Sequence, residues 1–139
     1  MNRRLRRPSS ETAVRGVVAA LGILPVVSGV RGVLEGPEGA PGGGSTTPSV
    51  DSEYRFVNVF WLAVGPGLCW SMAAPRERAT TTRILLGLAA SGGVPRLMSW
   101  RAVGRPHPVF RAATALELIG VPAVLLWHRS VFGSDPQSA

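Results

Sequence analysis

Four ionisable side chains stand within long apolar stretches of the 139-residue sequence, and they are its best candidates for chemistry. They are Arg31, Arg55, Arg96 and Glu117, and the polar Asn58 follows Arg55 at nearly one helical turn. A charge inside an apolar helix is costly unless it has a partner or faces a watery cavity. These five residues therefore form the candidate polar cluster of the protein.

Helical spacing indicates how the candidate polar cluster is assembled. Arg96 follows Gly92, and Glu117 follows Ala113, at one helical turn, so each charge lies on a stripe of small residues where two helices can approach closely. If the helices alternate in direction, Arg96 lies about 6 Å and Glu117 about 14 Å from the same membrane face. A long Arg side chain covers most of this difference, so we expect the two to meet. The other arginines of the cluster fall in the same half of the membrane, which predicts one outward-facing polar pocket.

Three interpretations of the candidate polar cluster remain open from the sequence. In the structural one, Arg96 and Glu117 form a buried ion pair that fixes helix register, and Arg31 and Arg55 reach the outer headgroups. In the binding one, Arg55, Arg96 and Glu117 hold an anionic or polar small ligand, such as a lipid headgroup or a quinone. In the third, Glu117 relays protons.

Other catalytic or metal chemistry has little support in the sequence. It has no Ser-His-Asp order, no phosphate-binding glycine loop and no metal-ligand spacing. His107 and His128 lie about 20 residues apart without acidic or cysteine partners, which disfavours a metal site. The sole cysteine, Cys69, lies in an apolar run, which predicts a buried, unreactive thiol. We expect no catalytic residue, no metal and no cofactor.

The elements that carry these residues are four apolar segments, at residues 14–34, 54–74, 80–100 and 108–128. At about 1.5 Å per residue, each helix approaches the roughly 30 Å thickness of the hydrocarbon core of a bilayer. Residues 35–53, which contain GPEGAPGGGSTTPS, are predicted to be a flexible loop. The sequence therefore predicts an all-α fold, a four-transmembrane-helix bundle in a single domain.

A soluble helical bundle is the rival interpretation. A soluble helix would carry a polar face at a period of 3.6 residues. These segments are instead apolar nearly all round, with Gly and Pro residues that helices in lipid tolerate. The net charge is +7, from 15 basic and 8 acidic residues, but the arginines flank the apolar segments rather than forming a basic patch. We therefore expect a lipid bilayer and no nucleic acid as partner.

The distribution of arginine predicts the orientation. Arginines crowd residues 1–15 and the connection between the second and third segments, whereas residues 35–53 have none. Because basic loops stay in the cytoplasm, we expect a multi-pass cell-membrane protein with both termini there, a basic tail at 1–13 and a short tail at 130–139. The amino-terminal stretch also resembles a signal peptide, but it lacks a small-x-small cleavage site, which favours a retained first helix.

Three motifs follow one another along the chain: DSEYRFVNVFWLAVG, SGGVPRLMSWRAVGRPHP and ALELIGVPAVLLWHR. Together they resemble the bacterial membrane proteins grouped as domain of unknown function 4345. The matching positions are Asp51, Glu53, Arg55, Phe56, Gly92, Gly93, Arg96, Ser99, Glu117 and Trp127. Pro95 departs from the small or apolar residue expected there. The resemblance covers about residues 14–129 and implies a four-helix membrane protein, without a known activity.

The sequence thus predicts a non-enzymatic membrane protein. It would be a bundle that binds a lipid or a lipophilic small molecule, or an accessory subunit of a membrane complex, as a homo-oligomer or within a larger assembly. The alternative is a membrane-embedded enzyme or redox partner acting on a lipophilic substrate. In that case Glu117 serves as acid and base while Arg96 tunes it.

Overall fold

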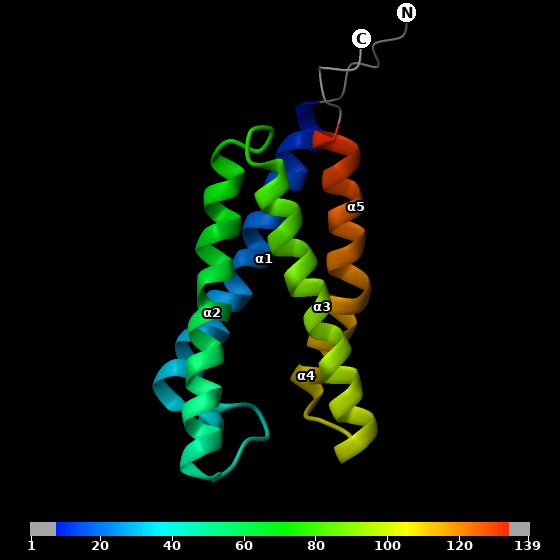
Figure 1. Ribbon diagram of the computed structural model, residues 1–139. Helices are drawn as coiled ribbons and strands as arrows, with labels where there is room; N and C mark the ends of the chain where they lie inside the picture. The colour runs from blue at the N-terminus through cyan, green and yellow to red at the C-terminus, as the bar shows by residue number, and fades with distance from the viewer. Residues whose placement is uncertain (1–7, 134–139) are drawn as a thin grey trace, which may run out of the picture.

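The computed structural model describes residues 8–133, and every regular element in this range is helical (Figure 1). In chain order the elements are α1 (Pro8–Glu35), a 3-10 turn η1 (Pro37–Gly39), α2 (Pro48–Ala73), α3 (Ala79–Val103), α4 (Pro108–Ala115), a π-helical turn η2 (Leu116–Gly120) and α5 (Val121–Phe132). The last three form one continuous fourth helix, Pro108–Phe132. Most of the predicted tails, 1–13 and 130–139, lies outside the described residues.

The prediction of four helices is confirmed, but the helices are longer than predicted. α1 begins at Pro8 rather than at residue 14, and α2 begins at Pro48 rather than at residue 54, so part of the predicted loop 35–53 is helical. The first residues of α2 are those typical of a helix N-terminus. The Thr47 hydroxyl oxygen accepts a hydrogen bond from the Val50 N–H at 3.4 Å, and Pro48 fills the first helical position, where its missing N–H is not needed.

The helices alternate in direction, so the start of α1 and the end of α5 lie at the same end of the bundle (Figure 1). α1 makes its most extensive contact with α2, and α3 packs along the whole fourth helix. Figure 1 shows α2 and α3 close together near their connecting loop and diverging toward the other end. The bundle therefore consists of two helix hairpins, a first hairpin (α1 and α2) and a second hairpin (α3 with α4, η2 and α5).

The shared core fills the half of the bundle nearest the start of α1 and the end of α5. Its buried residues come from all four helices: Val14, Val18, Val64, Leu68, Met72, Leu86, Ala89, Val121, Val131 and Phe132. Thr82 donates a hydrogen bond of 2.9 Å to the Ser71 hydroxyl inside this region, and neither residue is exposed. The candidate polar cluster lies in the other half, where the two hairpins diverge.

Glycines bring α1 and α2 into backbone contact in the first hairpin. A Cβ added at Gly29 would lie 2.8 Å from the Leu62 Cα and 2.9 Å from the Leu62 nitrogen. One added at Gly22 would lie 3.0 Å from the Gly65 carbonyl oxygen. Small residues at such a contact are typical of helices that associate in lipid, where close approach rather than water exclusion holds them together.

Three helices are long and apolar enough to cross a membrane: Ser10–Glu35, Pro48–Ala73 and Pro108–Phe132. α3 carries Arg83, Arg96 and Arg101, and it is not among the helices that are apolar enough to cross by length and composition alone. Large apolar side chains point outward on all four helices, among them Ile23, Phe60, Ile84 and Leu126, which are 59–64% exposed. Such an apolar exterior is unfavourable in water and suits contact with lipid.

The prediction that Cys69 is buried is wrong. Its side chain is exposed, and its sulfur lies 3.9 Å from the Ala19 carbonyl oxygen at the edge of the first hairpin. The reason is that a helix with an apolar surface all round carries apolar residues on its outer face as well as its inner one. Apolar surroundings in the sequence therefore do not predict burial in this kind of protein.

Candidate functional site

A buried carboxylate on the fourth helix is the starting point of the candidate site. The Glu117 side chain is 7% exposed and belongs to the π-helical turn η2, in which the Val121 N–H bonds to the Leu116 carbonyl oxygen. A π turn contains one residue more than an α turn, and such turns are frequent at functional sites. One residue beyond this turn, after Val121, stands Pro122, which cannot donate a backbone hydrogen bond.

Two consecutive glycines on α3 face Glu117 and its neighbour Leu118 on the fourth helix. A Cβ at Gly93 would lie 2.6 Å from the Leu118 Cγ and 3.1 Å from the Glu117 Cβ. A Cβ at Gly92 would lie 3.5 Å from the Glu117 Oε2. Gly93 thus permits the close approach of the two helices, whereas a Cβ at Gly92 would make an ordinary van der Waals contact with the carboxylate.

Arg96, one turn further along α3, pairs with this carboxylate. Its Nε lies 2.8 Å from Glu117 Oε2 and 3.1 Å from Oε1. The guanidinium carbon also lies 5.4 Å from the centre of the Phe110 ring of α4, within the range of a cation–π contact. The structure therefore brings together Arg96 and Glu117, as the depth argument predicts.

Arg96 holds Glu117 through Nε alone. Within residues 8–133 its two terminal amino groups make no hydrogen bond, and 35% of its side chain remains exposed. A guanidinium carries five N–H donors in a fixed plane, so most of its donors are unused here. The result is a neutral ion pair with a free donor edge.

Arg55 has a different set of partners. Its Nε donates to Asp51 Oδ2 at 2.8 Å, and its Nη1 donates to the Val33 and Leu34 carbonyl oxygens at 2.7 and 3.0 Å. These carbonyls belong to the last turn of α1, which has no further helical N–H to bond them. The chain turns away at Gly36, whose φ of +67° is accessible mainly to glycine. Arg55 therefore caps α1.

Arg31 and Asn58 also belong to the first hairpin. Arg31 pairs with Glu35 at 2.9 Å and donates to the Gly39 carbonyl oxygen at 3.1 Å, on an exposed surface. Asn58 is 9% exposed and donates to the Tyr54 carbonyl oxygen at 2.7 Å. The five residues therefore do not form one pocket. The stripe that carries Arg55 and Asn58 packs against α1 rather than facing the second hairpin.

His128 is a buried polar residue that the sequence analysis considered only as a metal ligand. It is fully buried, its ring centre lies 5.0 Å from that of Phe132, and neither ring nitrogen has a hydrogen-bond partner within residues 8–133. The burial of His128 could have been predicted from its spacing along the helix. It lies two helical turns after Val121, on the same buried stripe of α5.

Comparison with known proteins places this geometry in a family. The family described as domain of unknown function (DUF4345) matches residues 13–128, which include most of both hairpins and the whole candidate polar cluster. The chain belongs to this family. No curated protein and no solved structure matches this DUF4345 chain.

The contacts give a physical meaning to the motifs that carry the DUF4345 resemblance. Asp51 and Arg55 cap α1, while Gly93, Arg96 and Glu117 join α3 to the fourth helix. The family description names no activity. Any function must therefore be argued from the geometry of the site.

Proposed function

We propose that this DUF4345 chain is a four-span protein of the cell membrane that binds a lipid or a lipophilic small molecule at Arg96, without turnover. It does so alone or as an accessory subunit of a larger membrane complex. One observation carries the proposal: Arg96 is neutralised by Glu117 through Nε, yet its terminal amino groups have no partner within the described range and a third of its side chain is exposed.

The free N–H donors of the Arg96 guanidinium favour a ligand that carries oxygen acceptors on an apolar molecule. A guanidinium edge binds carbonyl and phosphate oxygens in two parallel hydrogen bonds. Because Glu117 already balances its charge, the pair does not need an anion, and an ester or quinone carbonyl suits it as well as a phosphate. Both Glu117 oxygens accept from Arg96, so binding is better supported than proton transfer.

The direction of the helices supports the proposal that α3 makes a fourth crossing. α3 runs back between two helices that are apolar enough to span, and its 25 residues give it a length of about 37 Å. Arg83 and Arg101 lie near its ends, where long side chains reach headgroups. Arg96 is neutralised by Glu117. Each arginine of α3 is therefore either paired with a carboxylate or able to reach the headgroups, so none would lie as an unpaired charge in the hydrocarbon layer.

Reporter fusions test the number of crossings. With four spans and cytoplasmic termini, green fluorescent protein should fluoresce when fused to either end of the chain. Alkaline phosphatase inserted after Gly44, in the connection between α1 and α2, should be active, because that loop would face the outside. If the two ends report opposite sides, α3 does not cross and the four-span proposal is wrong.

Native mass spectrometry of the detergent-purified protein tests ligand binding. We expect the parent protein to retain a lipophilic ligand that the Arg96→Lys variant loses. Lysine can still pair with Glu117, but it lacks the planar donor edge, and one or two lost hydrogen bonds correspond to roughly a tenfold weaker affinity. Thermal unfolding of the variant should remain close to that of the parent.

The matched control for this experiment is Arg31→Lys, which changes an exposed ion pair of the first hairpin. It should retain the ligand. Equal retention by parent and Arg96→Lys would contradict the proposed binding site. If a protein partner copurifies with both the parent and Arg96→Lys, the chain is an accessory subunit that does not depend on the Arg96 site. If the protein turns over a substrate and Glu117→Gln abolishes this turnover, the chain is an enzyme.

A further inference from the structure

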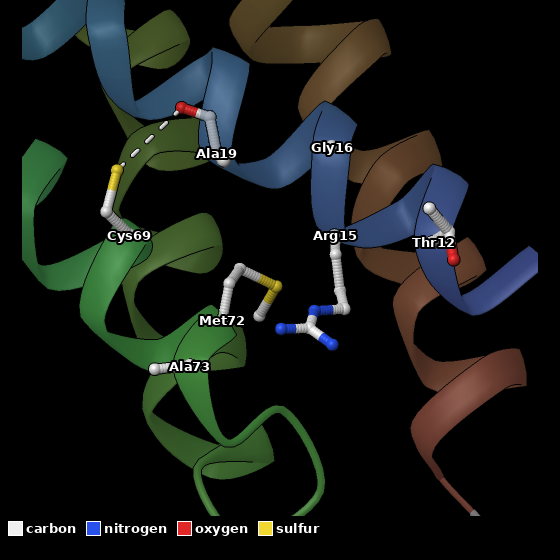
Figure 2. A pocket seen from close by; sticks show the side chains of 7 residues that line it. All are labelled: Thr12, Arg15, Gly16, Ala19, Cys69, Met72 and Ala73. Atoms are coloured by element: carbon white, nitrogen blue, oxygen red, sulfur yellow. Dashed lines mark hydrogen bonds between the residues drawn. The ribbon is translucent and has the colours of Figure 1, made fainter.

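A shallow hollow of about 460 Å³, open over most of its extent, lies between α1 and α2, at the opposite end of the first hairpin from Arg55. Figure 2 shows the Arg15 side chain extending into it from α1, towards Met72 of α2. Ala19 and Cys69 line its far side, and Gly16 lies on its α1 wall. The hollow thus combines one cation and the polar Thr12 with small and apolar residues.

Arg15 differs from neighbouring arginines because it has no partner among the residues that the structure describes. Arg76 is paired with Glu11, and Arg78 donates to the Trp70 carbonyl oxygen at 2.7 Å while lying over the Trp70 ring. Arg15, by contrast, makes no hydrogen bond or ion pair within residues 8–133, and its side chain is exposed. Its charge is available to a ligand.

The depth of Arg15 matches that of a lipid phosphate. The apolar span of α1 begins at Ser10, so Arg15 lies about 7.5 Å inside the start of that span. At that depth a long Arg side chain reaches the headgroup region while its stem stays in the apolar layer. Of the other lining residues, Gly16, Ala19 and Cys69 continue from Arg15 toward the middle of the span.

We propose that this hollow binds one anionic phospholipid, with its phosphate on Arg15 and the upper part of one acyl chain along Gly16, Ala19 and Cys69. The proposal rests on the membrane-spanning arrangement proposed above, but not on the Arg96 site. An anionic headgroup is favoured because the hollow holds a free cation and no carboxylate lines it. A zwitterionic headgroup would bring its own cation toward Arg15.

The experiment is native mass spectrometry with phosphatidylglycerol and phosphatidylcholine of identical acyl chains, added separately to the full chain in a neutral detergent. The parent should retain one phosphatidylglycerol under collisional activation that removes phosphatidylcholine. Arg15→Gln should lower this preference about fivefold, as expected for one Arg–lipid contact near the surface. Arg101→Gln, which removes an exposed arginine from the end of α3, is the matched control and should keep it.

A second variant tests the acyl chain separately from the charge. A Cβ at Gly16 meets no atom within 4 Å, so Gly16→Leu can fold normally while its side chain fills the hollow. It should lose phosphatidylglycerol although Arg15 is intact. Unchanged retention by Arg15→Gln would overturn the proposal. So would retention by Gly16→Leu together with displacement by inorganic phosphate, which would show that Arg15 binds phosphate without the chain.

These outcomes are independent of the Arg96 site. The Arg96→Lys variant should keep its phosphatidylglycerol, and Arg15→Gln should keep the ligand bound at Arg96. If every variant loses both phosphatidylglycerol and the ligand at Arg96, and the reporter fusions contradict four spans, then the proposed membrane arrangement is wrong rather than either binding site.

Discussion

Replacing Arg96 with Leu should lower the free energy of unfolding by about 2–3 kcal/mol. The reason is that Glu117, with a side chain only 7% exposed, would be left in the bundle without its partner. Breaking a fully buried pair costs roughly 3–5 kcal/mol, and we expect less here because the Arg96 side chain is 35% exposed. The measurement is equilibrium unfolding in mixed micelles, followed by circular dichroism.

The double variant Arg96→Leu with Glu117→Leu should recover most of the lost stability, because it leaves no unpaired charge behind. Arg101→Leu provides the control for removing an exposed arginine from the same helix, and should change little. A single Arg96→Leu variant that unfolds like the parent would show that the ion pair does not stabilise the second hairpin.

The second large effect is expected from Gly29→Ala in the first hairpin. The added Cβ would lie 2.8 Å from the Leu62 Cα and 2.9 Å from the Leu62 nitrogen, so α1 and α2 would have to separate. Overpacking of this kind costs typically about 1–3 kcal/mol, and backbone atoms cannot give way as a flexible side chain can. The same unfolding measurement, with size-exclusion chromatography to detect aggregation, reports the effect.

Gly87→Ala is the matched control for this substitution. A Cβ at Gly87, in α3, meets no atom within 4 Å. Because alanine favours the helix over glycine by about 1 kcal/mol, this variant should be as stable as the parent or slightly more stable. If Gly29→Ala behaves in the same way, the backbone contact between α1 and α2 is not what holds the first hairpin together.

Much of the architecture could be predicted from the sequence because apolar run length alone locates helices of this kind. The helix ends were harder, since α1 and α2 continue through polar residues beyond the apolar runs. The sequence nevertheless marks the starts of α1 and α2, by the prolines Pro8 and Pro48 at their first positions and by the capping residue Thr47. The apolar run located α3 as well, but hydropathy did not mark it as a span, because its arginines are accommodated only in the folded protein.

The candidate site was predictable in part, for a geometric reason. Depth along antiparallel helices could place Arg96 beside Glu117, but it could not say which neighbour the stripe of Arg55 would face. Closer partners were available in the sequence. Asp51 lies four residues before Arg55, and Glu35 lies four residues after Arg31, which is the spacing of adjacent side chains on a helix. Local pairs of this kind form before any tertiary contact is needed.

The extra residue in the turn Leu116–Gly120 has a consequence for the length of this helix. Each residue adds about 100° of rotation to an α-helix, but the wider π turn takes up one extra residue without passing this rotation on to α5. Deleting one residue within the turn would therefore rewind it as a regular α-helix and leave His128 on the buried side of α5. Deleting one residue after Val121, where the helix is regular, would instead rotate the end of α5 by about 100° and expose His128. The length of this helix is thus constrained in α5 but not in the turn that carries Glu117.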